Sequence, residues 1–209
     1  MRAPQHGFSL IELMISLVVM ALLISLGVPA FTEWIQNQQT RAAAEATLNG
    51  LQVARAEAVA RNTNVSFQFM ADLTSSCATA PASGPGGALS SISWVVSLGD
   101  PTGACDRKVG DNPPGPVIQS RTGTEGTPNA IVTTNPAGST TVTFTPLGAT
   151  TSNPDGSPVM LSMKLSNTVL TSGGVDIKSA RSLKIVINPG GSTRMCDPSV
   201  AAPDTRACP

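Results

Sequence analysis

The sequence lacks tyrosine altogether, and its other aromatic residues make up only 3% of the 209 residues. A hydrophobic core must therefore come mainly from valine, leucine, isoleucine and methionine. Charged residues are also scarce, at 12% of the chain, which is about half the share typical of soluble domains. The 13 basic and 13 acidic residues cancel, so global charge gives no reason to expect nucleic acid or acidic lipid as a partner.

Signatures of catalysis and of metal binding are missing as well. The chain contains no G-x-S-x-G, Ser-x-x-Lys, P-loop or H-E-x-x-H motif. Its single histidine, His6, precedes the first apolar segment, and no two cysteines have C-x-x-C spacing. We therefore predict that the protein is not an enzyme and needs neither a metal nor a cofactor.

The cysteines are four in number, Cys77, Cys105, Cys196 and Cys208. An even number outside the cytosol is typical of disulfides, and four cysteines can pair in three ways. Proximity in the sequence favours Cys77–Cys105 and Cys196–Cys208. A zinc site is the competing and less favoured interpretation.

An apolar segment over residues 10–28 is interrupted only by Glu12 and two serines. A helix of about 19 residues at 1.5 Å per residue extends roughly 28 Å, which is enough to cross a bilayer core. Arg2 precedes the segment, whereas Glu33 and Arg41 follow it. This order favours a cytoplasmic N-terminus, with the rest of the chain on the far, oxidising side.

Three simpler interpretations compete for this segment: a buried core helix, a secretory signal peptide and a generic single-span anchor. Its length argues against a core helix. Glu12 argues against a signal peptide, because a carboxylate costs roughly 2.5–3.5 kcal/mol at mid-membrane. Pro29 also argues against it, because it lies beside the point where a signal peptidase would cut. A generic anchor explains the length but not Gly7 and Phe8 followed by Glu12.

The segment Gly7-Phe8-Ser9-Leu10-Ile11-Glu12-Leu13-Met14 resembles the class III signal of type IV pilins and type II secretion pseudopilins. The resemblance implies that a prepilin peptidase cuts after Gly7, methylates Phe8 and removes His6 with the leader. It also implies that Glu12 serves assembly. A bond from Glu12 to the Phe8 amine of a neighbour would set axial register. The local alternative is a capping box between Ser9 and Glu12.

Good helix formers continue over residues 32–61, and residues 62–64 end the helical pattern. Gly27 and Pro29 predict a kink or local melting, because proline removes a backbone hydrogen bond. Alternating patterns then predict strands at 65–69, 92–98, 117–121, 130–134, 140–145, 159–165 and 183–187. Long polar loops at 71–91, 99–116 and 121–129 join some of them. We expect an α+β fold, in which a long kinked N-terminal helix, membrane-spanning in its first half, packs on an antiparallel β-sheet head of the GspH-like pilin kind.

The tail over residues 188–198, with Arg-x-Cys-Asp-Pro, and the helix end at 52–62 resemble FimT/FimU minor pilins, which are relatives of the GspH pseudopilins. The resemblance implies a leader at 1–7, a transmembrane helix at 8–30, a periplasmic amphipathic helix half at 31–62 and a β-rich head at 63–209 with a C-terminal disulfide loop. It implies one pass through the inner membrane, with the N-terminus cytoplasmic and the head in the periplasm.

The implied function is that of a minor pilin that helps to initiate or cap a type IV pilus, with other pilins and the prepilin peptidase as partners. A GspH-type pseudopilin of type II secretion is one alternative. A DNA receptor at the pilus tip is another, since some FimT relatives bind DNA through a Gly-Arg-x-Arg turn. Only Arg194 matches that turn here, and the acidic residues Asp197 and Asp204 lie close to it in sequence, so we expect nucleic acid binding to be weak at best.

Overall fold

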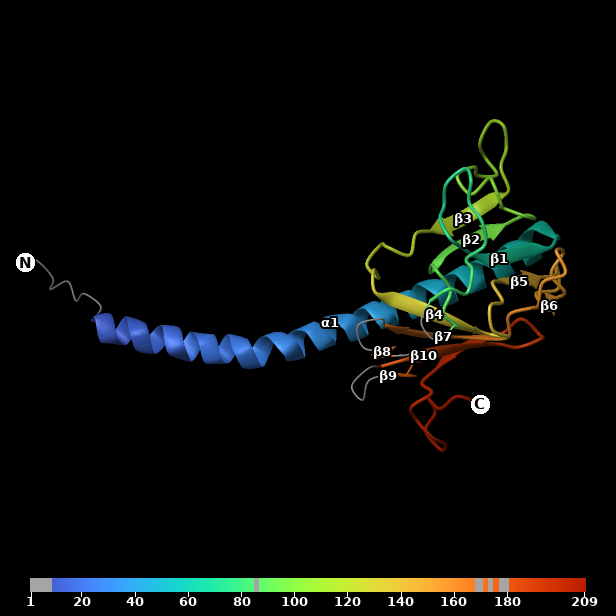
Figure 1. Ribbon diagram of the computed structural model, residues 1–209. Helices are drawn as coiled ribbons and strands as arrows, with labels where there is room; N and C mark the ends of the chain where they lie inside the picture. Colours follow the sequence, from blue (N-terminus) through green and yellow to red (C-terminus); the bar gives the residue numbers. More distant parts are fainter. Residues whose placement is uncertain (1–8, 85–86, 168–170, 173–174, 177–180) are drawn as a thin grey trace, which may run out of the picture. The chain divides into compact units, whose positions relative to one another are not determined.

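The computed structural model describes residues 9–84, 87–167, 171–172, 175–176 and 181–209 (Figure 1). It contains two compact units, Met1–Ile35 and Gln36–Pro209. One helix, α1, covers Leu10–Arg61 and contributes to both units, whereas the described strands all belong to the second unit. The chain therefore combines a helical N-terminal unit with a helix-and-sheet unit, in which residues 63–209 are the β-rich head.

Helix α1 ends in a turn that satisfies its last carbonyl groups. Asn62 follows the final helical residue, Arg61, and adopts a positive φ of 51°. The Thr63 amide donates to the Ala58 carbonyl, and the Asn62 amide donates to the Val59 carbonyl, both at 3.3 Å. This Schellman arrangement favours asparagine or glycine at the left-handed position. It confirms the prediction that residues 62–64 end the helix.

The helix is unbroken through Gly27 and Pro29, so the local melting considered for this point does not occur. A proline removes one backbone hydrogen bond, and the helical turns on both sides retain theirs. The side chains of residues 26–30 lie outside the described part of the structure. The kink at this point stays a prediction.

A five-stranded antiparallel sheet has the order β3-β2-β1-β5-β6. Its strands are β1 (Val65–Met70), β2 (Ser93–Ser97), β3 (Val117–Arg121), β5 (Thr141–Phe144) and β6 (Thr150–Thr151). A four-stranded antiparallel sheet has the order β11-β10-β7-β4. Its strands are β4 (Ala130–Asn135), β7 (Ser162–Asn167), β10 (Leu183–Ile187) and β11 (Thr193–Cys196). A small pair joins β8 (Thr171–Ser172) to β9 (Val175–Asp176).

Strands β1 and β2 are buried on both faces. On one face, Phe67 and Trp94 join the main hydrophobic core, which also contains α1 residues. On the other face, Met70 and Val95 form a second cluster with Cys77 and Cys105. Alternation along a strand sends neighbouring side chains to opposite faces, so one strand supplies two separate cores.

The main core is built where α1 meets both sheets of the head. The helix contributes small side chains, Ala43, Ala44, Ala54 and Ala58, together with Leu51. The five-stranded sheet contributes phenylalanines, and the four-stranded sheet contributes Met163, Leu165, Ile185 and Ile187. Small residues on the helix allow large rings on the sheet to approach its backbone, which is the usual way to fill a core densely.

The structure confirms the predicted α+β architecture and most of its strands. The bounds of β3 and β10 are the predicted ones, and β1, β2, β4, β5 and β7 overlap their predictions. The prediction missed β11, because it treated the residues after Ile187 as a tail. A turn in which the Asn188 amide donates to the Ser192 carbonyl at 2.9 Å instead folds the chain back onto β10.

Replacing Gly50 with leucine should destabilise the head. A Cβ atom at Gly50 would lie 2.8 Å from the Phe67 ring and 3.0 Å from the Trp94 ring. Overpacking of this kind costs about 1–3 kcal/mol, whereas the better helix propensity of leucine returns less than about 1 kcal/mol. Denaturant unfolding of the full chain in detergent micelles measures the difference.

The control is Gly110→Leu, because nothing lies within 4 Å of a Cβ atom at Gly110. This variant should unfold at nearly the same denaturant concentration as the wild type. Equal stability of Gly50→Leu and Gly110→Leu would contradict the close helix–sheet contact.

Candidate functional site

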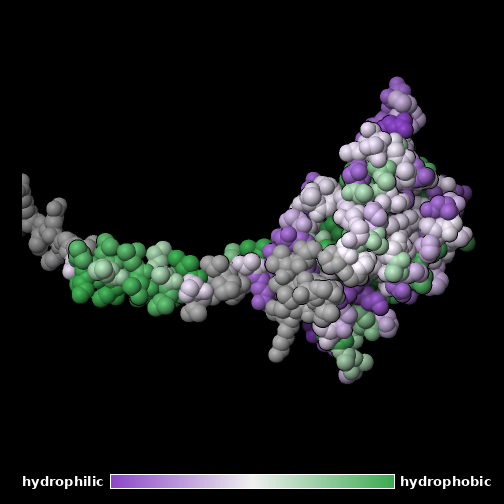
Figure 2. Space-filling model, viewed as in Figure 1, coloured by the Kyte–Doolittle hydropathy of each residue, from purple (hydrophilic) through white to green (hydrophobic). Residues whose placement is uncertain are grey.

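The N-terminal part of α1 presents apolar side chains to its surroundings (Figure 2). Every residue from 10 to 25 is exposed, and the large apolar side chains among them are 49–78% exposed. No helix within the described residues combines the length and hydropathy needed to cross a membrane. An exposed apolar surface of this extent is typical of a segment that contacts lipid or another protein.

The hydroxyl groups of two serines in this apolar segment are hydrogen-bonded to backbone carbonyls of the same helix. The Ser16 hydroxyl donates to the Leu13 carbonyl, and the Ser25 hydroxyl donates to the Leu22 carbonyl, each at 2.9 Å. A hydroxyl satisfied by its own helix needs no water, so it is compatible with an apolar environment. The serines therefore add little polarity to the surface.

Glu12 differs from the serines because its carboxylate has no partner in the described part of the chain. The Leu13 amide donates to the Ser9 carbonyl at 3.2 Å, but no side-chain hydrogen bond joins Ser9 to Glu12 among the described residues. The capping box considered above is therefore not formed there. Glu12 lines a shallow groove on one helix face with the apolar residues Ile11, Ile15, Val19, Met20 and Leu23 and with Ser16.

Gly7 and Phe8, the predicted cleavage and methylation residues, lie outside the described residues, together with the whole predicted leader. The start of the predicted membrane span at Phe8 lies outside them too. Their roles stay predictions that rest on the sequence motif.

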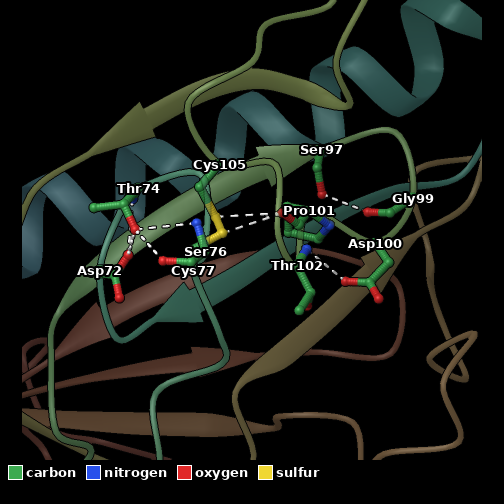
Figure 3. Close-up of a disulfide and its surroundings, with 10 residues drawn as sticks. All are labelled: Asp72, Thr74, Ser76, Cys77, Ser97, Gly99, Asp100, Pro101, Thr102 and Cys105. Atoms are coloured by element: carbon green, nitrogen blue, oxygen red, sulfur yellow. Dashed lines mark hydrogen bonds between the residues drawn. A yellow bond between two sulfur atoms is a disulfide. The ribbon is translucent and has the colours of Figure 1, made fainter.

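The first disulfide joins Cys77 to Cys105, the pairing that sequence proximity favours. Figure 3 shows it between the loops that carry Thr74 and Pro101. Its sulfur atoms lie 3.3 and 3.6 Å from the Pro101 carbonyl oxygen, and both cysteines are buried. Closing a loop of this length stabilises the folded state by about 3–4 kcal/mol in the chain-entropy model. The bond holds the loops over the outer face of the five-stranded sheet.

Short local bonds order the loop before this disulfide. The Thr74 hydroxyl donates to Asp72 Oδ1 at 2.6 Å, and the Thr74 amide donates to the same oxygen at 2.9 Å. These two bonds stabilise the charged carboxylate and lower the pKa of Asp72. These residues form a local turn beside the disulfide.

The second disulfide joins Cys196 to Cys208 and closes the C-terminal loop, again as sequence proximity favours. Arg194 on β11 holds this loop from the sheet side. Its guanidinium group donates to the Thr205 carbonyl at 2.7 Å and to the Ala207 carbonyl at 3.3 Å. The Asp197 amide adds a backbone bond to the Arg206 carbonyl at 2.8 Å.

Among the described basic residues near Arg194, Arg206 has a counter-charge. Arg206 pairs with Asp204 at 2.8 Å, and Lys184 is cross-strand to Cys196 at the base of the loop. Lys178 lies outside the described residues. Arg194 itself is engaged with two backbone carbonyls of the C-terminal loop.

Comparison with known proteins gives two family matches. The profile of the family described as Type II transport protein GspH matches residues 43–191. The profile of the prokaryotic N-terminal methylation motif matches residues 2–28. Among curated proteins, none matches the sequence.

Two crystal structures of the type IV minor pilin FimU from Pseudomonas aeruginosa are similar to the chain. The structure in space group P65 is 17% identical, with 78% of this chain and 97% of that chain aligned and a TM-score of 0.43. The structure in space group P21 is 15% identical, with 81% of this chain and 97% of that chain aligned and a TM-score of 0.44.

Replacing Arg206 with glutamine should raise the pKa of Asp204 from about 2 toward 3.8, because the arginine side chain is the strongest cause of the lowered pKa. The rise will be incomplete, since the backbone amide of residue 206 still donates to the carboxylate. A lowered pKa means that the stability contributed by this carboxylate is present above its unfolded pKa of about 3.9 and is lost as the pH falls through about 2. An NMR titration of the Asp204 carboxyl measures it.

The control is Arg181→Gln, which removes the same charge from another exposed position. It should leave the pKa of Asp204 near about 2. An equal rise in both variants would mean that general charge, and not the Asp204–Arg206 contact, determines the pKa.

Proposed function

Since the chain belongs to the GspH family of type IV pilin-like proteins and carries the prokaryotic N-terminal methylation motif, we propose that it is a minor pilin that helps to initiate or cap a type IV pilus. Membership of this family makes it a minor pilin or pseudopilin, and the motif marks a membrane-anchored subunit of a pilus or pseudopilus. We further propose that its role is structural rather than catalytic.

The observation that carries the proposal is the isolation of Glu12 on an exposed apolar helix face. An ionisable residue in such a position is costly and is usually paired. The hydroxyl groups of the two serines donate to carbonyls of their own helix, whereas the Glu12 carboxylate has no partner among the described residues. A partner from another molecule is therefore the simplest way to neutralise it.

Cleavage after Gly7 would create that partner. The new α-amino group of Phe8 is mostly cationic at neutral pH, and methylation leaves it able to carry the charge. Glu12 of one subunit then meets the Phe8 amine of its neighbour. In a surrounding of low dielectric constant, a misplaced subunit leaves both charges desolvated and unpaired, so the pair selects one axial register.

We also propose one membrane topology for the chain, which the exposed apolar residues at the start of α1 support. Residues 8–30 form the membrane-spanning segment, residues 31–62 form the periplasmic helix half, and residues 63–209 form the head. Arg2 on the leader favours a cytoplasmic N-terminus in the inner membrane. The head then lies in the periplasm, where the disulfides Cys77–Cys105 and Cys196–Cys208 form readily.

The resemblance of the tail to FimT/FimU minor pilins favours a pilus over a secretion machine. A GspH-type pseudopilin of type II secretion stays the alternative, because the matching family profile carries that description. We do not favour a DNA receptor, since the Arg194 guanidinium is already bonded to two carbonyls of its own chain.

Replacing Glu12 with glutamine should abolish incorporation into the filament while leaving the protein in the membrane. The amide cannot neutralise the Phe8 amine of a neighbour, so the energetic preference for one register is lost. The measurement is immunoblotting of sheared surface pili and of the membrane fraction. Wild-type protein should be found in both fractions, and Glu12→Gln protein only in the membrane.

The matched control is Glu33→Gln, which makes the same change in the same helix beyond the apolar segment. This variant should still enter pili. Normal incorporation of Glu12→Gln would refute the assembly role. If wild-type protein is absent from pili but deletion of its gene stops exoprotein secretion, the secretion alternative is correct.

A further inference from the structure

Phe31 and Trp34 form an exposed aromatic pair on α1. Their ring centroids lie 5.9 Å apart with an interplanar angle of 25°, and the residues are 62% and 58% exposed. Within the described residues, the Trp34 indole N–H has no protein acceptor. The pair thus combines a large apolar surface with one free hydrogen-bond donor, which is the combination that favours a boundary between water and an apolar phase.

This pair is unusual in a chain that contains only five phenylalanines, two tryptophans and no tyrosine. Four of these rings are buried in the cores of the head: Phe67, Phe69, Trp94 and Phe144. Phe8 lies outside the described residues. Both exposed aromatic residues of the described chain therefore occur together, within one turn of the same helix.

The position of the pair along α1 matches the thickness of a bilayer. From Leu10, the first residue of α1, to the middle of the pair there are about 22 residues, or about 34 Å of helix. A bilayer is about 30 Å thick in its hydrocarbon core and about 40–45 Å with its headgroups. If the start of α1 lies at the cytoplasmic boundary of the hydrocarbon core, Phe31 and Trp34 fall in the opposite headgroup layer, where tryptophan is enriched in membrane helices.

We propose that Phe31 and Trp34 bind the periplasmic headgroup layer and fix how deeply the helix inserts before assembly. This inference rests on the proposed function, because it needs a membrane-held subunit. Residues 31–40 contain Glu33 but no lysine or arginine. The pair therefore acts through the amphipathic indole ring of Trp34 and the apolar ring of Phe31, and it binds zwitterionic phospholipid as well as anionic phospholipid.

Tryptophan fluorescence can test the proposal, because the chain has one exposed and one buried tryptophan. The full chain is reconstituted into phosphatidylcholine vesicles at low protein-to-lipid ratio. Quenchers are phosphatidylcholines that are spin-labelled on the headgroup, high on the acyl chain, or near its methyl end. Trp94→Phe isolates the signal of Trp34, and Trp34→Phe isolates that of Trp94 as the matched control. If Trp94→Phe fails to fold, subtracting the Trp34→Phe signal from the wild-type signal gives the same information.

The shallow labels should quench Trp34 about twofold or more strongly than the label near the methyl end, with or without added phosphatidylglycerol. None of the labels should quench Trp94. Quenching of Trp34 that is absent, or strongest near the methyl end, would overturn the proposal. Quenching that is present at low protein-to-lipid ratio and is lost only as the ratio rises supports the proposal, because association then covers a pair that the headgroups held before assembly.

Flotation of the vesicles separates this inference from the proposed function. Protein that floats with the vesicles but shows unquenched Trp34 contradicts the aromatic anchor alone. Protein that fails to float contradicts the membrane-held subunit, and with it the anchor.

Discussion

The constraint central to this molecule is the carboxylate of Glu12, which lies on an exposed apolar helix surface and has no counter-charge among the described residues. Glu12 has no partner among the described residues, while the neighbouring serines bond to their own helix. An isolated carboxylate in an apolar setting is unfavourable, and we propose that association with another subunit supplies its counter-charge. The exposed apolar surface and the unpaired Glu12 carboxylate are together what the proposed assembling subunit requires.

Helix α1 serves two different environments along its length. Its first part exposes large apolar side chains, whereas its second part buries alanines against the sheets of the head. The two parts of the helix differ in the size of their side chains. In the second part, Gly50 and the alanines allow the Phe67 and Trp94 rings to contact the helix closely. The disulfide Cys77–Cys105 lies on the other face of the same sheet. The head is therefore stabilised from both sides of its central strands.

Much of this architecture could be predicted from the periodicity of apolar residues and from the turn residues that separate the periodic segments. The end of α1 was recognisable from Asn62, and β3 and β10 stand out as isolated alternating segments bounded by proline, glycine or polar residues. Strand β11 was not recognisable, because four residues carry too little pattern and their pairing depends on the turn at 188–192. The engagement of Arg194 with the Thr205 and Ala207 carbonyls was also hidden, since contacts closed by a disulfide loop leave no periodic signal. Glu12 was conspicuous because polarity is rare in its segment.

The most direct test of the account is mass spectrometry of the N-terminus of the protein purified from membranes of its native host. The account predicts a chain that begins at Phe8 and carries one methyl group on its α-amine, so that a cation is available to pair with Glu12. A mature chain that begins at Phe31, recovered from the soluble periplasm, would lack the apolar segment and Glu12. That result would contradict the claim that the chain is an assembling, membrane-held subunit.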